Sequence, residues 1–161
     1  MARRPIDSYL NDHLAGATLG CDLAEHIRSM NEGTPLGEVM ASVAAEIEKD
    51  RDTLRQLMQR LEISENRVKR AGGWVAEKVS RVKFSGLSSG EPELGTFMAL
   101  EGLSLGIEGK ADLWRALAQV TDEFAPVAAL DLDELIARAE SQRSVVERER
   151  MACARRALAD S

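Results

Sequence analysis

The stretch around which the chain is organised lies between residues 97 and 117. Wound at 3.6 residues per turn, this stretch places large apolar side chains on one broad side and small apolar residues on the other. A helix that is apolar around most of its circumference packs against several neighbours. The segment is therefore predicted to be the central helix of an all-α bundle. Its narrow polar strip is formed by Glu101, Glu108, Asp112 and Arg115.

Apolar positions at helical spacing predict three further long helices. The first covers residues 7–31, with Asp7 or Ser8 as its N-cap. The second covers 35–61, and the last covers 131–158. Each has a continuous apolar stripe that must be buried against another element.

A shorter helix is predicted at 64–82, followed by a loop at 84–95 that is rich in Gly, Ser and Pro. Thr96 is the expected cap of the central helix, and residues 124–127 form a link. The long helices pair first with second and central with last, with the short helix in the connection between the pairs. Nothing in the pattern divides the chain, so one domain is expected over 1–161.

Composition and charge narrow the classes of partner. Aromatic residues make up only 4% of the 161 residues, which favours helices over a sheet. The formal net charge of −6 argues against nucleic acid or an anionic membrane as the main partner. We find no signal peptide and no bilayer-spanning stretch, and so expect a cytoplasmic protein. Cys21 and Cys153 are predicted to be small buried hydrophobes rather than a disulfide.

Several charged or titratable residues interrupt the apolar stripes. His13 and Asp12 do so in the first helix and Asp50 in the second, while Arg143 and Arg150 recur at heptad spacing in the last. Unpaired charges are costly to bury, so these groups are expected to pair with one another. The predicted network of interior ion pairs consists of Asp12, His13, Asp50, Glu101, Glu108, Arg143 and Arg150.

Other interpretations of the same residues stay open. Glu101 and Glu108 are equally typical of a solvated strip. Arg143 and Arg150 can lay their stems on apolar surface and extend their guanidinium groups into water. His13 is typical of a core histidine hydrogen-bonded to an acid such as Asp50, or else of a metal ligand.

Three short motifs carry a resemblance to a known class. They are Tyr-Leu-Asn-Asp-His-Leu-Ala-Gly at 9–16, Gly-Thr-Pro-Leu-Gly at 33–37 and Leu-Glu-Gly-Leu at 100–103. In these motifs the chain resembles small helical proteins of actinobacteria, and in helix order and length it resembles the ferritin-like superfamily. The resemblance implies a ferritin-like four-helix bundle with a short extra helix in the crossover between the second and third long helices. The narrower likeness implies no activity.

The metal-binding ferritin-like proteins hold two irons with carboxylates and with Glu-x-x-His motifs on two helices. Here the second helix offers Glu46 and Asp50 without a histidine, and the last helix offers Glu140-x-x-Arg143. Arginine stays protonated and cannot ligate a metal. We therefore expect a non-enzymatic bundle that has lost di-iron chemistry and needs no cofactor, with arginines in the place of the metal.

A bundle without di-iron chemistry is expected to act through association with other protein chains. The pairs Gly16/Gly20 and Gly102/Gly106 are suited to close helix packing, within one chain or across a homodimer. The apolar girdle of residues 97–117 favours a homodimer.

Two other functions remain open. One is a ferritin-like oxidase or iron-handling protein, with a di-iron or mononuclear site for iron or another divalent metal. The other is a carrier with an apolar cavity between its helices. The candidate metal ligands are His13, Glu46, Asp50, Glu101 and Glu140.

Overall fold

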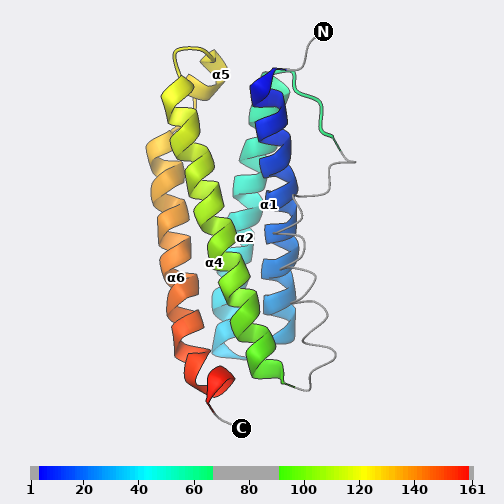
Figure 1. The fold of residues 1–161 in the computed structure, drawn as a ribbon, viewed down its shortest axis with the longest axis vertical. Coiled ribbons are helices and arrows are strands. Elements are labelled where there is room, and N and C mark those ends of the chain that lie inside the picture. Colours follow the sequence, from blue (N-terminus) through cyan, green and yellow to red (C-terminus); the bar gives the residue numbers. More distant parts are fainter. Residues whose placement is uncertain (1–3, 67–90, 160–161) are drawn as a thin grey trace.

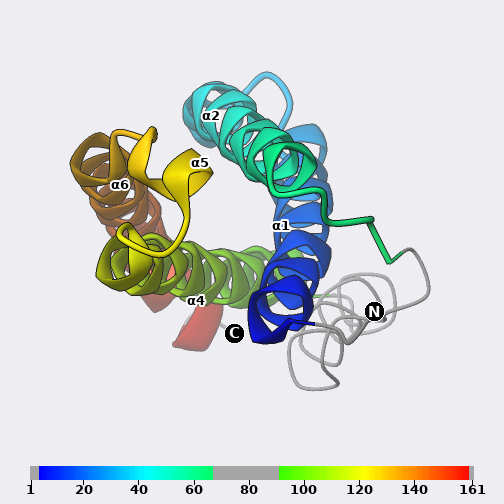
Figure 2. The same cartoon turned by 90° about the horizontal axis from the view of Figure 1, so that it is seen from above.

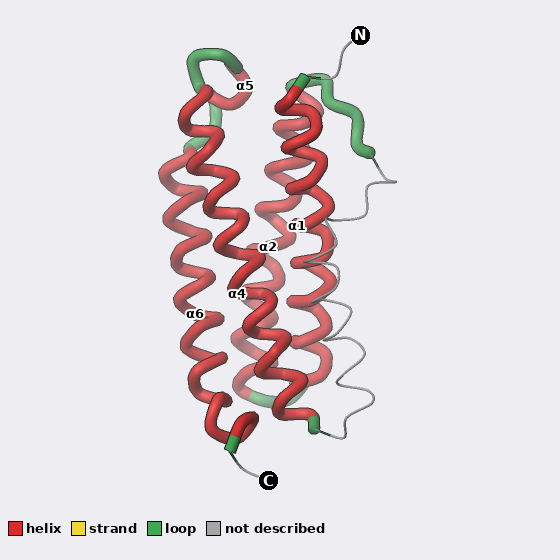
Figure 3. Tube along the Cα trace, viewed as in Figure 1, coloured by secondary structure: helices red, strands yellow, loops and turns green. Residues whose placement is uncertain are grey.

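The computed structural model describes residues 4–66 and 91–159, and within these ranges every regular element is a helix (Figures 1 and 3). The predicted all-α bundle of four long helices is confirmed. Each long helix runs along the length of the bundle. These helices are α1 (Pro5–Met30), α2 (Pro35–Arg60), α4 (Pro92–Leu117) and α6 (Leu132–Leu158).

The long helices form two antiparallel pairs, α1 with α2 and α4 with α6 (Figure 1). The turn between α4 and α6 contains the 3₁₀ helix η1 (Ala118–Val120) and the short helix α5 (Ala125–Ala128). Seen from above, α1 packs on α4, while α2 and α6 touch at few positions (Figure 2). Helices α2 and α4 run in the same direction, so α2 ends and α4 begins at opposite ends of the bundle (Figure 1).

Most predicted helix boundaries are close to those in the structure, and the beginnings of α1 and α4 are corrected. Helix α1 begins at Pro5, so Asp7 lies in its first turn, where its carboxylate accepts hydrogen bonds from Arg4 N (3.1 Å) and Nε (3.0 Å). Helix α4 begins at Pro92, so Thr96 lies inside it. Proline suits the first turn of a helix because its missing N–H would have no partner there.

Two further predictions concern segments only partly described. Residues 64–66 have no helical structure, and the rest of the predicted helix at 64–82 lies outside the described residues. The predicted loop at 84–95 is described only from residue 91, and there it is mostly helical.

The exit from α2 is fixed against α1 by the buried Asn11. Its amide nitrogen donates to the carbonyl oxygens of Asp7 (2.8 Å) and Ser64 (3.2 Å), and its oxygen accepts from the backbone N–H of Asn66 (2.6 Å). Arg4 adds a hydrogen bond to the carbonyl oxygen of Leu61 at 2.8 Å. These contacts satisfy backbone groups that a helix end leaves free.

The core consists of two apolar clusters placed one after the other along the bundle. One cluster includes Ile47, Ile107 and Val146, and the other includes Leu54 and Leu113. A polar layer lies between the two clusters. It contains Asp50 of α2, Lys110 of α4 and Arg138 of α6. Both cysteines are free thiols; Cys153 is buried as predicted, whereas Cys21 is only half-buried.

The tight turn between α1 and α2 generates the first prediction. A Cβ atom at Gly37 would lie 2.1 Å from the carbonyl oxygen of Asn31, whereas a Cβ at Gly16 would meet no described atom within 4 Å. Gly37→Ala should lower the free energy of unfolding by about 1–3 kcal/mol through this clash. Gly16→Ala should raise it by up to about 1 kcal/mol through helix propensity. Urea denaturation measures both, and equal stability of the two variants would contradict the model of the turn.

Candidate functional site

The polar layer is centred on Asp50 of α2, whose side chain is only 1% exposed. One carboxylate oxygen accepts from Arg138 Nη2 at 2.5 Å. The other accepts from Lys110 Nζ at 2.6 Å and from Gln142 Nε2 at 3.0 Å. A buried carboxylate requires such partners because it has lost its hydration.

Gln142 of α6 completes the layer by bridging three residues. Its side-chain oxygen accepts from Lys110, and its Nε2 also donates to Glu46 Oε2 at 3.0 Å. The two acids Glu46 and Asp50 are thus balanced by the two cations Lys110 and Arg138. We call these five residues the Asp50 cluster.

The ion-pair network predicted from the sequence does not include Lys110 and Arg138, the two cations of the Asp50 cluster. Lys110 lies three residues after the buried Ile107 of α4, and Arg138 lies three residues after the buried Leu135 of α6. This helical spacing is the signal that could have found them. Burial lowers the pKa of Lys110, and the neighbouring Asp50 acts in the opposite direction.

The predicted arginines lie elsewhere, on the surface seam between α4 and α6. Arg143 Nε is 3.4 Å from Glu108 Oε2, and the arginine side chain is 42% exposed. Arg150 Nη1 is 3.7 Å from Glu101 Oε2, and its guanidinium lies over the ring of Phe97 at 5.5 Å. The expected pairs of acid and arginine therefore form for Glu101 and Glu108, but they lie at the edge of the bundle and not in its interior.

Further ion pairs strengthen this seam. Arg115 contacts Glu108, Asp112 and Glu140, each at 2.9 Å. Arg150 also contacts Glu147 at 2.8 Å. This hydrogen bond and a weaker contribution from the hydroxyl of Ser104 lower the pKa of Glu147 to about 2. Partly exposed pairs of this kind contribute little stability individually.

The structure does not bring the five candidate metal ligands together. Glu46 and Asp50 both accept from Gln142, whereas Glu101 and Glu140 contact the seam arginines. Within residues 4–66 and 91–159, no group of three or more His, Cys, Asp or Glu side chains is placed to hold a metal ion. Both Asp50 oxygens are taken by cations and an amide, so the described residues do not fit the di-iron centre that the resemblance implies.

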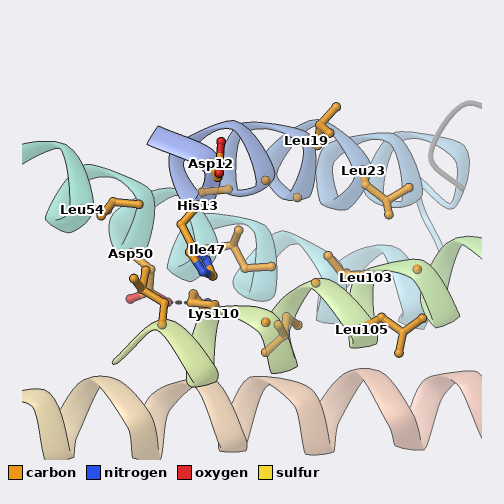
Figure 4. Close-up of a pocket in the computed structure, with 18 of the residues that line it drawn as sticks. Asp12, His13, Leu19, Leu23, Ile47, Asp50, Leu54, Leu103, Leu105 and Lys110 are labelled. Carbon is orange, nitrogen blue, oxygen red and sulfur yellow. Dashed lines mark hydrogen bonds and ion pairs between the residues drawn. The ribbon is translucent and has the colours of Figure 1, made fainter. Parts of the chain in front are cut away.

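An apolar cavity of about 350 Å³ lies between α1 and α4, with α2 as its inner wall (Figure 4). Asp50 and Lys110 belong to its lining, so the cavity ends on the Asp50 cluster. His13 and Asp12 line it from α1. The large apolar side chains of the lining are Leu19, Leu23, Ile47, Leu54, Leu103, Leu105, Ile107, Leu113 and Trp114.

Glycines create much of this space. A Cβ atom at Gly16, Gly20, Gly106 or Gly109 would have no described atom within 4 Å, and one at Gly102 would meet only Leu23 Cδ2 at 3.5 Å. The expectation of close helix packing at Gly16/Gly20 and Gly102/Gly106 is therefore corrected for the residues that the structure describes. These glycines leave room between α1 and α4, where larger residues would fill it.

Two polar groups of the cavity lining have no hydrogen-bond partner among the described residues. The indole N–H of Trp114 is buried without an acceptor. His13 packs its ring against the edge of Tyr9 at 4.6 Å, and no described residue donates to or accepts from its imidazole. Burial lowers the pKa of His13 from 6.5, against the opposing effects of Asp12 and Asp112.

The chain was compared with models of protein families, with curated proteins and with solved structures, and none of them matches it. Among the helices described here, none combines the length and the apolar character needed to cross a bilayer.

The Asp50 cluster generates the second prediction. Asp50→Ala leaves Lys110 and Arg138 without their shared carboxylate, so the free energy of unfolding should fall by about 3–5 kcal/mol. The matched control is Glu48→Ala, an exposed acid on the same helix, which should change stability by less than about 0.5 kcal/mol. Equal effects of the two substitutions in urea denaturation would show that the cluster does not hold the helices together.

The burial of His13 generates the third prediction. The pKa of His13 in the folded chain is lowered below 6.5, so His13 takes up its proton at a higher pH in the unfolded chain than in the folded one. Stability should therefore decrease from about pH 7.5 to about pH 5.5, the range in which an ordinary histidine titrates. His13→Gln should reduce this loss, whereas His26→Gln, which removes the other histidine, should retain it. Urea denaturation across this range measures the effect, and the same slope in His13→Gln and the wild type would refute the assignment.

Proposed function

We propose that this protein is a non-enzymatic helical bundle that binds a small, largely apolar molecule between α1 and α4. The observation that carries the proposal is the cavity of about 350 Å³, which ends on the buried Asp50 cluster. Ligand sites in proteins are typically concave and apolar, with a few polar groups that orient the ligand. This cavity has that composition.

The size of the cavity limits the ligand. An apolar cavity of about 150 Å³ accommodates one benzene molecule, so this cavity has room for about a dozen non-hydrogen atoms. Its glycines support a binding role, because each helical glycine costs up to about 1 kcal/mol relative to alanine. The Cβ of an alanine at Gly16, Gly20, Gly106 or Gly109 would have no described atom within 4 Å. A bundle built only for stability would gain by closing this space.

We also propose a ferritin-like topology for the bundle. The parallel directions of α2 and α4 support it, since they require one long connection between two antiparallel pairs. Ferritin-like metalloproteins hold their metals between the long helices, and we propose that the Asp50 cluster takes that place in this chain. Binding in the neighbouring cavity is thus the function that we assign to the scaffold.

The fourth prediction tests the cavity with naphthalene, which carries no polar atom. Isothermal titration calorimetry should detect one naphthalene per chain. Gly106→Leu should weaken binding at least about tenfold, because forcing a side chain and the ligand into one space costs about 1–3 kcal/mol. Ala116→Leu is the matched control, since Ala116 is exposed on the same helix and does not line the cavity.

A second copy of the chain could instead cover the open side of the cavity, where Leu105 is 39% exposed. Sedimentation velocity of the wild type and of Gly106→Leu distinguishes the two occupants. A monomer that binds naphthalene supports the proposal. A dimer that Gly106→Leu dissociates, with no naphthalene bound, would replace the proposal with self-association.

A further inference from the structure

We infer that the ligand carries a neutral oxygen acceptor, such as a carbonyl or an ether, which accepts a hydrogen bond from Lys110 at the polar end of the cavity. This inference rests on the proposed function and adds the chemical class of the ligand. It follows from the hydrogen-bonding capacity of Lys110, from the position of His13 at the same end of the cavity and from the charges around the cavity.

Lys110 has a donor to spare. An ammonium group carries three N–H donors, and the described partners of Lys110 are Asp50 Oδ2 and the side-chain oxygen of Gln142. Its side chain is 14% exposed, and it belongs to the cavity lining. A donor that loses water when a ligand fills the cavity is costly unless it finds a new acceptor. A ligand oxygen at this end of the cavity would remove that cost.

His13 of the lining supports the same ligand chemistry. His13 approaches the same end from α1, as Figure 4 shows. Its neutral imidazole has one donor and one acceptor nitrogen. An apolar molecule with one oxygen would match these groups better than a pure hydrocarbon.

The charges of the cavity lining favour a neutral oxygen over a carboxylate. The negative charge of Asp50 is already balanced by Lys110 and Arg138 within the Asp50 cluster, and burial lowers the pKa of the half-buried His13. A carboxylate would bring an unbalanced negative charge into this lining and would compete with Asp50 for Lys110. A cationic amine would face Lys110 directly, and both Asp50 oxygens are already engaged. A neutral acceptor avoids both penalties.

Three probes with the same naphthalene body and similar size test the inference. They are 2-ethylnaphthalene, which has no acceptor, 2-acetylnaphthalene, which has a neutral acceptor, and 2-naphthoate, which has an anionic one. With the wild-type chain at pH 7.5, calorimetry should show 2-acetylnaphthalene binding about tenfold more tightly than either of the others. The acetyl group gives up hydrogen bonds to water on binding, so it can surpass the ethyl group only where the site donates one in return.

Lys110→Met identifies the donor. Methionine retains most of the apolar stem, and Arg138 and Gln142 still contact Asp50, so we expect this variant to fold. Its affinity for 2-ethylnaphthalene should change less than about twofold, whereas its preference for 2-acetylnaphthalene should disappear. Trp114→Phe should retain the preference, because the indole N–H is enclosed by protein and the Lys110 donor remains. Circular dichroism confirms that each variant is folded.

The outcomes separate this inference from the proposed function. If no probe binds to the wild type, the proposed function is wrong. If 2-ethylnaphthalene binds as tightly as 2-acetylnaphthalene, the cavity is a binding site and the inferred acceptor is wrong. Tightest binding of 2-naphthoate would also overturn the inference, in favour of an anionic ligand. A preference for 2-acetylnaphthalene that survives Lys110→Met would exclude Lys110 as the donor.

Discussion

The structure depends on the neutralisation of one buried carboxylate. Asp50 lies in the middle of α2, where water cannot solvate it, and its partners come from α4 and α6. Because α2 and α6 touch at few positions, the contacts of Asp50 with Arg138 and Gln142 join the two helix pairs across that side of the bundle. A cluster of this kind adds little net stability relative to apolar residues, but removing one partner is costly. We propose that it sets the register of one pair against the other.

The Asp50 cluster also determines the character of the cavity. Lys110 serves the cluster and the cavity together, so the apolar space between α1 and α4 ends on a polar group that is held in place from two other helices. The cations that neutralise Asp50 engage both of its oxygens, which leaves no vacant oxygen for a metal. The same contacts that argue against a metal centre thus supply a fixed donor for a ligand.

The cavity exists because small residues face each other on α1 and α4. Glycine usually allows two helices to approach closely, and the sequence supports that expectation equally well. Here the distance between α1 and α4 is set by larger residues such as Leu23, Leu103 and Trp114, which are buried against neighbouring helices. The glycines then leave a gap. Whether a glycine closes or opens an interface depends on its neighbours in space, and periodicity along one helix does not contain that information.

The sequence by itself determined the four long helices, most of their ends and the need of Asp50 for a partner, because helix periodicity, capping and the cost of a buried charge are local properties. Only the tertiary structure decided which cations meet Asp50. The rotation of α4 and α6 turns Lys110 and Arg138 inward and leaves Arg143 and Arg150 on the seam. That rotation follows from the packing of all the helices together, so the charged positions of one helix do not reveal it.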